Sequence, residues 1–364
     1  MGFYSTFIVA DSVEVFTKSA NGQGVRWVSD GSGEYEVSTV ENLDFNRGTK
    51  IVLKLKPESR EFSRESEVEK ILRKYSLFIT YPIKLNGQLI NNLQAIWYRD
   101  KREVTEDEYE RFFEHLANTK VPYKFKLHYS TDVPLAIKAL FYIPSTHVER
   151  MGLTQEQGTM HLYCRKVLIK ENCSELLPSY LRFVKGVVDC EDLPLNISRE
   201  TYQDSALIAK LRNVVTRRVL KLLEDELKRD PSRYDIWYDQ FNQFLKEGLM
   251  MDTENKDALL KLMRYTSTFT DSSTLISLDD YVKKMKPGQE RIYFISAPNK
   301  EAALNSPFME PFKNAGAEAP PVLILTNNVD EVCFQQLSTY KNFTFMNVES
   351  SYEQISKDFG SADN

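Results

Sequence analysis

The stretch EDLPLNISRETYQD, Glu191 to Asp204, is a loop that leads directly into a long helix. Pro194 disfavours the α conformation at the residue before it, so we expect the chain to enter this loop extended. After the loop, apolar residues recur every three or four positions, which predicts an amphipathic helix. Its apolar face comprises Leu207, Leu211, Val214, Val215, Leu222 and Leu223.

Three polar residues of the loop, Asn196, Arg199 and Gln203, are spaced three and four apart. If the chain turns helical at Ser198, Arg199 and Gln203 point the same way. A guanidinium offers a fork of charged donors that suits phosphate oxygens. The alternative is a surface ion pair between Arg199 and a neighbouring acid, which is the commoner role of such an arginine. The residues alone leave both roles open.

The run Pro-Leu-Asn-Ile-Ser-Arg-Glu, residues 194–200, followed by Gln203, resembles the catalytic loop in the middle domain of the heat-shock-protein-90 chaperone family. The preceding run LRFVKGVVDCED, residues 181–192, resembles the same family. The resemblance implies an ATP-dependent molecular chaperone that binds and remodels unfolded or client proteins. It also implies that Arg199, with Asn196 and Gln203, is catalytic, and that Arg199 reaches the γ-phosphate of ATP held by the neighbouring domain.

The first residues resemble the end of that family's ATP-binding domain. Gly2-Phe3-Tyr4-Ser5 is similar to the end of its glycine-rich lid, and Gly48-Thr49-Lys50 to its Gly-Thr element. The resemblance implies that Gly2, Phe3 and Thr49 bind ATP, with Phe3 beside the nucleotide and the Thr49 hydroxyl reading the adenine through water. The family's glutamate base, magnesium-binding asparagine and adenine-reading aspartate would lie upstream of Gly2. We therefore expect half a nucleotide site, and no ATP hydrolysis by this chain alone, although the full-length protein would be an ATPase that needs Mg²⁺.

Composition limits the class of protein. The chain has 364 residues, too many for one compact core. Charged residues make up 27% and hydrophobic residues 42%, as in soluble globular proteins. The net charge of −5 argues against a dedicated nucleic-acid binder. No apolar run reaches the roughly 18 residues of a membrane span.

Cysteine and histidine spacing predicts neither disulfides nor a metal site. Cys164, Cys173, Cys190 and Cys333 form no Cys-x-x-Cys pair, so we expect free thiols and a reducing compartment. The four histidines form no His-Glu-x-x-His motif.

Met1 is followed at once by a strongly patterned segment without a transit or signal peptide, as in a chain cut open within a domain.

We expect an α/β (α+β) protein: the remnant of an α/β-sandwich ATP-binding domain, then an α-β-α middle domain with a helical connector and a smaller α-β-α lobe. The predicted parts are 1–85, the end of the ATP-binding domain; 86–92, a short linker; 93–250, the large lobe; 251–288, the connector; 289–350, the small lobe; and 351–364, a polar tail.

Local patterns predict the elements of these parts. Strands are expected at 13–17, 24–29, 35–39, 50–56, 78–85, 123–129, 135–143 and 161–170. Capping boxes at Ser66–Glu69 and Thr105–Glu108 predict two helix starts. An aromatic stripe, residues 234–244, predicts a core helix that ends near Gly248. From residue 291 a β-α-β-α-β run predicts parallel strands, with helices at 300–315 and 331–340. The ends of these predicted strands lack the glycine-rich sequence typical of nucleotide-binding loops, so we expect no nucleotide site in this region.

The branch of the family and the partners also follow from the resemblance. The linker lacks a long charged run, and residues 92–98 and 128–135 are closest to the mitochondrial branch, that of the tumour-necrosis-factor-receptor-associated protein. This implies the mitochondrial matrix, with a bacterial-type cytoplasmic protein as the alternative. The expected partners are client proteins, co-chaperones and, at full length, a second copy. Trp97 would contact clients; alternatively it is an anchor in the core.

Two other functional classes are alternatives to such a chaperone. One is a non-catalytic module that binds clients or co-chaperones and never touches nucleotide; such a module needs no arginine aimed at a phosphate. The other is a self-sufficient kinase-like enzyme, but the sequence contains neither Gly-x-x-x-x-Gly-Lys-Ser/Thr nor His-Arg-Asp.

The helix after the loop also bears a basic strip, which either is simply solvated or docks the nucleotide domain. Its residues are Lys210, Arg212, Arg217, Arg218 and Lys221.

Overall fold

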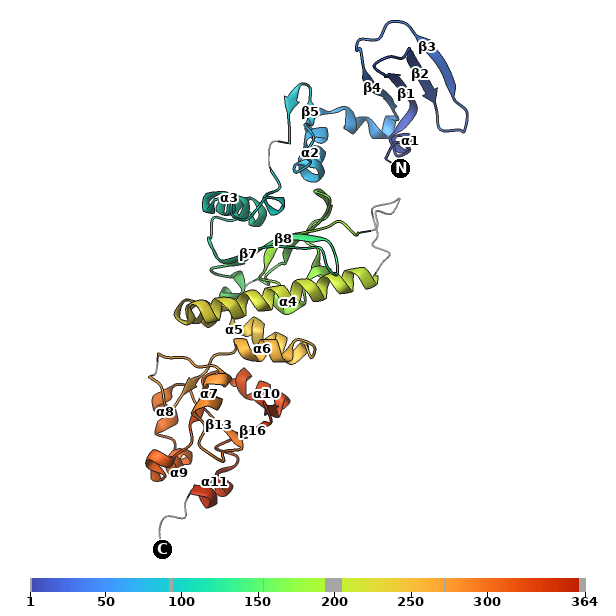
Figure 1. The fold of residues 1–364 in the computed structure, drawn as a ribbon. Coiled ribbons are helices and arrows are strands. Elements are labelled where there is room, and N and C mark those ends of the chain that lie inside the picture. The colour runs from blue at the N-terminus through green and yellow to red at the C-terminus, as the bar shows by residue number, and fades with distance from the viewer. Residues whose placement is uncertain (1, 92–93, 153, 194–204, 272, 360–364) are drawn as a thin grey trace. The chain divides into compact units, whose positions relative to one another are not determined.

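The computed structural model describes residues 2–91, 94–152, 154–193, 205–271 and 273–359. The chain divides into two compact units (Figure 1). The first contains residues 1–96, 163–169 and 193–202, and the second contains residues 97–162, 170–192 and 203–364. Three sheets of four or five strands alternate with helices, which confirms the predicted α/β class. The domain boundaries given above stay a prediction.

The first sheet has the order β3-β2-β1-β4, with β1 Ala10–Lys18, β2 Gly24–Ser29, β3 Glu36–Val40 and β4 Gly48–Leu55. All pairs are antiparallel, and the four predicted strands are confirmed. Gly31 and Gly33 turn the chain between β2 and β3 with φ of 84° and 103°, which only glycine adopts easily. A short helix, α1 Thr6–Val9, precedes β1.

The segment after this sheet differs from the prediction. Helix α2 is Glu65–Ser76, and Arg64 occupies its N-cap without a side-chain bond, so the predicted capping box at Ser66 is wrong. The strand predicted at 78–85 is also wrong, because only β5 Lys84–Leu85 pairs, with β6 Gln88–Leu89. The side chain of Asn91 accepts a hydrogen bond from the Ile83 N–H and donates to two earlier carbonyls. Those backbone groups therefore do not form hydrogen bonds to a neighbouring strand, and Pro82 has no N–H to donate.

The second sheet has the order β10-β9-β11-β8-β7. Its strands are β7 Tyr123–Thr131, β8 Ile137–Pro144, β9 Thr159–Cys164, β10 Val167–Lys170 and β11 Lys185–Cys190. The strands predicted at 123–129 and 135–143 are confirmed as β7 and β8, and they pair with each other in antiparallel orientation. The single strand predicted at 161–170 is wrong, because Arg165 and Lys166 form a tight turn with positive φ. The predicted capping box of Thr105 and Glu108 is confirmed at α3, Glu106–Ala117.

Two long helices follow: α4 Ser205–Arg229 and α5 Pro231–Met251. On α4, Leu211, Val215, Leu222 and Leu223 are buried, as the periodicity predicts. All five aromatic residues of the predicted α5 stripe are buried too. The helix does not end at Gly248 but continues for three residues. A Cβ atom at Gly248 would lie 2.6 Å from the ring of Tyr180, so this glycine serves close packing rather than helix termination.

The C-terminal sheet has the order β12-β14-β13-β16-β15: β12 Thr266–Ser267, β13 Arg291–Ser296, β14 Val322–Leu325, β15 Thr339–Tyr340 and β16 Phe343–Asn347. Its three central strands are parallel, as predicted, and its edges are antiparallel. The associated helices are α6 Lys256–Leu262, α7 Leu278–Lys284, α8 Lys300–Leu304, α9 Glu310–Asn314, α10 Asn328–Leu337 and α11 Tyr352–Phe359.

Two predictions for this region are wrong. The helix expected at 300–315 is split into α8, a 3₁₀ turn Pro307–Met309 and α9, because Pro307 and Pro311 each start a new segment. The tail expected from residue 351 instead forms α11 up to Phe359. Ile355 of α11 is fully buried against Met309 and Phe312, so this segment belongs to the core of the C-terminal sheet.

The side chains of all four cysteines are buried, and no disulfide joins cysteines within the described residues. Among the described residues, no helix combines the length and the apolar character that crossing a membrane requires.

Candidate functional site

The predicted catalytic residues Asn196, Arg199 and Gln203 lie outside the described residues. The structure does describe the two elements that flank them in sequence, β11 and α4. Just after β11, the Asp192 carboxylate accepts a hydrogen bond from the Ala136 N–H at 2.8 Å, and the Glu191 N–H donates to the Ala136 carbonyl. The chain therefore leaves the second sheet along a fixed path.

Helix α4 gives the loop a firm support on its other side. It is 25 residues long and packs against α5 and α6 through side chains that are almost completely buried. Most stability of such a helix comes from its packed face rather than from propensity.

The basic residues predicted on α4 are all exposed, in agreement with a solvated face. Two of them have partners within the protein: Lys221 pairs with Glu224 and Asp225, and the Arg218 guanidinium lies 4.4 Å from the centre of the Tyr129 ring. The docking alternative for the strip is not tested by these contacts.

The predicted ATP-binding residues lie on the first sheet and next to it. Thr49, the second residue of β4, lies directly opposite Thr17 of β1, and the two hydroxyls are 2.9 Å apart. Thr49 is exposed, so its hydroxyl can also bond to water or a ligand. Val15 lies two residues before Thr17 and is paired with Trp27 on β2. Side chains two residues apart share a face, so Trp27, Thr17 and Thr49 project from the same side of the sheet.

Phe3 belongs to an aromatic cluster on the same unit. Its ring centre lies 5.6 Å from that of Trp27 and 6.2 Å from that of Phe7, with edge-to-face geometry. The neighbouring Gly2 carbonyl accepts a hydrogen bond from the Ser5 hydroxyl. Phe3 packs against Trp27, and Trp27 projects from the same face as Thr49. Phe3 therefore lies next to that face. Sequence reasoning did not single out Trp27, although a tryptophan within a short predicted strand could have indicated a functional residue.

This face fits the base of a nucleotide better than its phosphates. It combines aromatic and aliphatic surface, including the half-exposed Ile51 opposite Val15, with a pair of hydroxyl groups. Flat apolar surface with a few placed polar groups is typical of ligand sites. Within the described part of the chain, no group of three or more histidine, cysteine or acidic residues could hold a metal ion.

Trp97 is an anchor in the core. Its side chain is 1% exposed, its indole N–H donates to the Asp189 carboxylate at 3.2 Å, and its ring packs against Phe112. A direct client contact through this indole would require the residue to leave its position. Asp189, itself 1% exposed, was missed from sequence, although a lone acid inside the apolar strand β11 indicates a buried partner.

Sequence reasoning also missed a set of internal ion pairs in the second unit. Arg182 bridges Glu149 and Glu247, and the Arg182 guanidinium holds the pKa of the Glu149 carboxyl below its usual range. Lys246 of α5 pairs with Asp330 of α10 at 2.9 Å, and both side chains are buried. Lys246 follows Phe244 and Leu245 in a stripe of core residues, which was the available signal.

Comparisons with known proteins agree with the resemblance. A family model described as Hsp90 protein matches residues 85–360. The chain is 42% identical over 342 residues to a chaperone protein HtpG of Desulfitobacterium hafniense, covering 93% of this chain and 55% of that protein. It is 41% identical to the mitochondrial TNF receptor-associated protein 1 homolog of Dictyostelium discoideum, covering 96% and 49%, respectively. It is 40% identical to the mitochondrial heat shock protein 75 kDa of Bos taurus, covering 96% and 50%.

The chain thus spans about half the length of the curated relatives it matches. The family model covers most of the chain, and it includes the segment that precedes α4. Together with the level of identity, this settles the family: the chain belongs to the Hsp90 family of chaperones.

Proposed function

We propose that this chain is part of an ATP-dependent molecular chaperone and that it supplies Arg199 to the γ-phosphate of ATP. The observation that carries the proposal is the sequence of the loop, residues 194–203, immediately before the firmly packed helix α4 of an Hsp90-family chain. The relatives that it matches are named chaperone and heat shock proteins.

In this mechanism Arg199 stabilises the charge that develops on the transferred phosphoryl group, as cations do in other phosphoryl transfers. Asn196 and Gln203 add neutral amide hydrogen bonds beside it. The base of ATP would lie on the face that carries Thr49, with Phe3 and Gly2 at its border. Bound ATP with Mg²⁺ supplies the phosphoanhydride bond that is cleaved. By the family resemblance, the asparagine that binds Mg²⁺ belongs to the part of the ATP-binding domain that precedes Gly2.

The partners and location belong to the same proposal. The full-length protein would act as a homodimer on unfolded or partly folded clients, assisted by co-chaperones. We place it in the mitochondrial matrix on the wording of residues 92–98 and 128–135. The relatives named mitochondrial and the bacterial HtpG have nearly equal identity, so a bacterial-type cytoplasmic protein is the alternative.

The nucleotide part of the proposal is tested by Thr49→Val in the full-length protein. Ser38→Ala is the matched control, because Ser38 is exposed on the opposite edge strand β3 and pairs with Arg26, which pairs with Phe16, so its hydroxyl projects from the other face of the sheet. Loss of one hydrogen bond of about 1 kcal/mol weakens ATP affinity about fivefold, as measured by calorimetry. Ser38→Ala should bind ATP like the wild type. Equal affinity of all three proteins would contradict the assignment of Thr49.

The same samples decide between the two functional classes. A non-catalytic interaction module predicts that the full-length protein suppresses client aggregation without binding ATP. The proposal predicts that it binds ATP and that client release depends on hydrolysis.

A further inference from the structure

A cavity of about 620 Å³ opens between helix α4 and the loop that joins α5 to α6. Its lining on α4 consists of four residues at intervals of three and four, which therefore share one face of the helix. These are Ala209, Arg212, Asn213 and Thr216. Residues 251–255 of the loop and residues 178–180 complete the lining, and all of them belong to the second unit. The volume is typical of small-molecule sites in proteins.

The loop side of the cavity is held in place by Asp252. Its carboxylate accepts hydrogen bonds from the Tyr180 hydroxyl at 2.6 Å, from the Asn255 side-chain amide at 2.8 Å and from the Asn255 backbone N–H at 3.0 Å. Because the protein itself supplies these donors, Asp252 anchors the loop. The groups that the loop offers to a ligand are then those of Thr253 and Glu254.

Thr216 is the residue that points to a ligand. It lines the cavity although it is only 2% exposed. Its hydroxyl forms no hydrogen bond to any residue that the structure describes. A hydroxyl removed from bulk water costs free energy unless it finds another partner. Since Thr216 borders the cavity, that partner is a molecule inside it.

Two unlike charges line the same cavity from its two sides. Arg212 is on α4 and Glu254 is on the loop, and neither forms an ion pair with another residue of the described ranges. Burial raises the pKa of Tyr180, and the charge of Arg212 opposes this rise. The guanidinium therefore lies on the side of α4 that faces Tyr180, which also lines the cavity.

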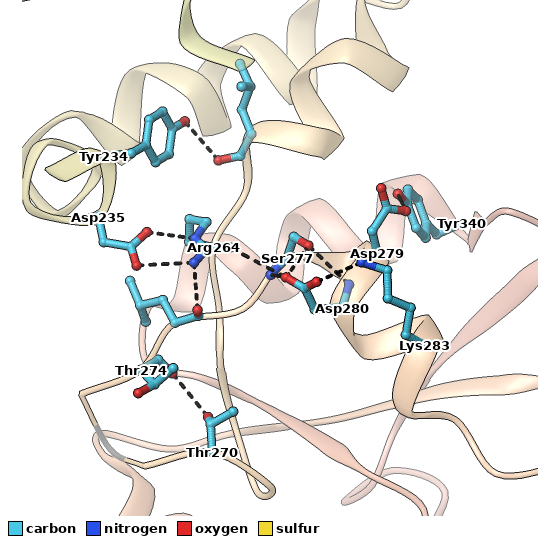
Figure 2. A network of polar contacts seen from close by, with 12 residues as sticks. Tyr234, Asp235, Arg264, Thr270, Thr274, Ser277, Asp279, Asp280, Lys283 and Tyr340 are labelled. Carbon is cyan, nitrogen blue, oxygen red and sulfur yellow. Dashed lines mark hydrogen bonds and ion pairs between the residues drawn. The ribbon is translucent and has the colours of Figure 1, made fainter. Parts of the chain in front are cut away.

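Another arginine of this unit shows the contrasting case. The Arg264 side chain is 7% exposed and makes two hydrogen bonds to the Asp235 carboxylate and one to the Leu275 carbonyl (Figure 2). Its donors are occupied by the protein, so it has little capacity left for a ligand. Arg212 keeps its fork of donors available to an anionic group in the cavity.

We propose that this cavity binds a small zwitterion of the α-amino-acid type. The ligand's carboxylate binds the Arg212 guanidinium and accepts a further hydrogen bond from the Thr216 hydroxyl. Its ammonium group binds the Glu254 carboxylate on the other side of the cavity. A phosphate ester with two negative charges fits less well, because Asp252 and Glu254 repel it.

The remaining lining favours an aliphatic side chain on this ligand. Pro178, Ala209 and Met251 contribute apolar surface to the cavity. The cavity is larger than one amino acid, so water shares it and bridges to the other polar groups. A ligand held in this way connects the first turns of α4 with the loop of residues 251–255.

The test is calorimetric titration of the full-length protein with three probes. They are L-leucine, L-leucinamide, which lacks the carboxylate, and 4-methylpentanoate, which lacks the ammonium group. We expect L-leucine to bind at least about tenfold more tightly than either analogue. Arg212→Gln and Glu254→Gln should each weaken the binding of L-leucine about tenfold. Arg212→Gln should leave the affinity for L-leucinamide unchanged, because that probe brings no carboxylate.

Two further variants and one further readout sharpen the test. Thr216→Val keeps the shape of threonine and should weaken the binding of L-leucine about fivefold. Arg111→Gln is the control, because Arg111 is an exposed arginine of α3, and it should bind L-leucine like the wild type. Added L-leucine should slow hydrogen exchange in residues 206–216, since binding stabilises the closed backbone there.

Three results would overturn the proposal: no binding of L-leucine at millimolar concentration, equal affinity for L-leucine and both analogues, or wild-type affinity of Arg212→Gln. Should Arg212→Gln fail to fold, Glu254→Gln, a change in an exposed loop, carries the same test with 4-methylpentanoate as its insensitive probe. None of these measurements involves ATP hydrolysis, so their failure leaves the proposed role of Arg199 untouched.

Discussion

The ion pair of Lys246 and Asp330 allows a quantitative test of how α5 holds α10. The two side chains are only 6% and 7% exposed, and their charged atoms are 2.9 Å apart. Asp330→Ala leaves the Lys246 ammonium buried without a counter-charge. Removing one partner of a buried pair costs about 3–5 kcal/mol, so we expect a loss of that size in the free energy of unfolding.

Replacing both partners should have a different result. Burial raises the pKa of Asp330, although the neighbouring Lys246 opposes this shift. Desolvation of the carboxylate therefore outweighs its pairing with Lys246. Lys246→Met combined with Asp330→Leu removes both desolvated charges and restores apolar packing. Such replacements are often neutral or stabilising, so we expect the double variant to be within about 1 kcal/mol of the wild type or more stable.

The assay is urea unfolding at neutral pH, with the two single variants and the double variant forming a mutant cycle. Arg111→Ala serves as the control, because Arg111 and Asp107 form an exposed pair, 74% and 64% accessible. That variant should lose less than about 1 kcal/mol. The reasoning is refuted if Asp330→Ala costs no more than this control, or if the double variant is as unstable as Asp330→Ala.

Two further outcomes are expected. Gly248→Ala should destabilise the protein by about 1–3 kcal/mol in thermal unfolding, although alanine is the better helix former, because its Cβ would lie 2.6 Å from the Tyr180 ring; unchanged or increased stability would show that Tyr180 yields freely. Arg182 lowers the folded pKa of Glu149, so this group stabilises the fold above its unfolded pKa of about 4.3 and loses that contribution as pH falls through the folded value. Glu149→Gln should therefore reduce the fall in the free energy of unfolding at acid pH. The same pH dependence in both proteins would contradict the assignment.

The long helices could be predicted from sequence because their apolar periodicity reflects their packing. The buried faces of α4 and α5 follow this rule. The failures come from contacts that periodicity does not encode. Asn91 takes backbone partners from a predicted strand, and Arg165-Lys166 form a turn without the usual glycine or asparagine. Gly248 marks close packing, although glycine more often marks a helix end.

The candidate site could be predicted only in part, for a related reason. The loop motif and the Gly-Thr element are local in sequence, so the resemblance identifies them. The partners that fix a site are distant: Trp97 binds Asp189 across 92 positions, and Phe3, in the turn before α1, packs against Trp27 on β2. A single sequence carries no direct signal for such pairs. The proposed role of Arg199 therefore needs a functional measurement.

That measurement is single-turnover ATP hydrolysis by the full-length protein carrying Arg199→Ala, next to a nucleotide titration of the same sample. Removing a charged donor that acts in the transition state should cost about 3–4 kcal/mol, a rate loss on the order of 10²–10³. ATP affinity should be nearly unchanged, because the base is bound elsewhere. Arg199→Lys should recover little, Gln203→Ala should have a smaller effect in the same direction, and Arg111→Ala, an exposed arginine of α3, should have none. Hydrolysis by Arg199→Ala at the wild-type rate would contradict the account and favour a non-catalytic interaction module.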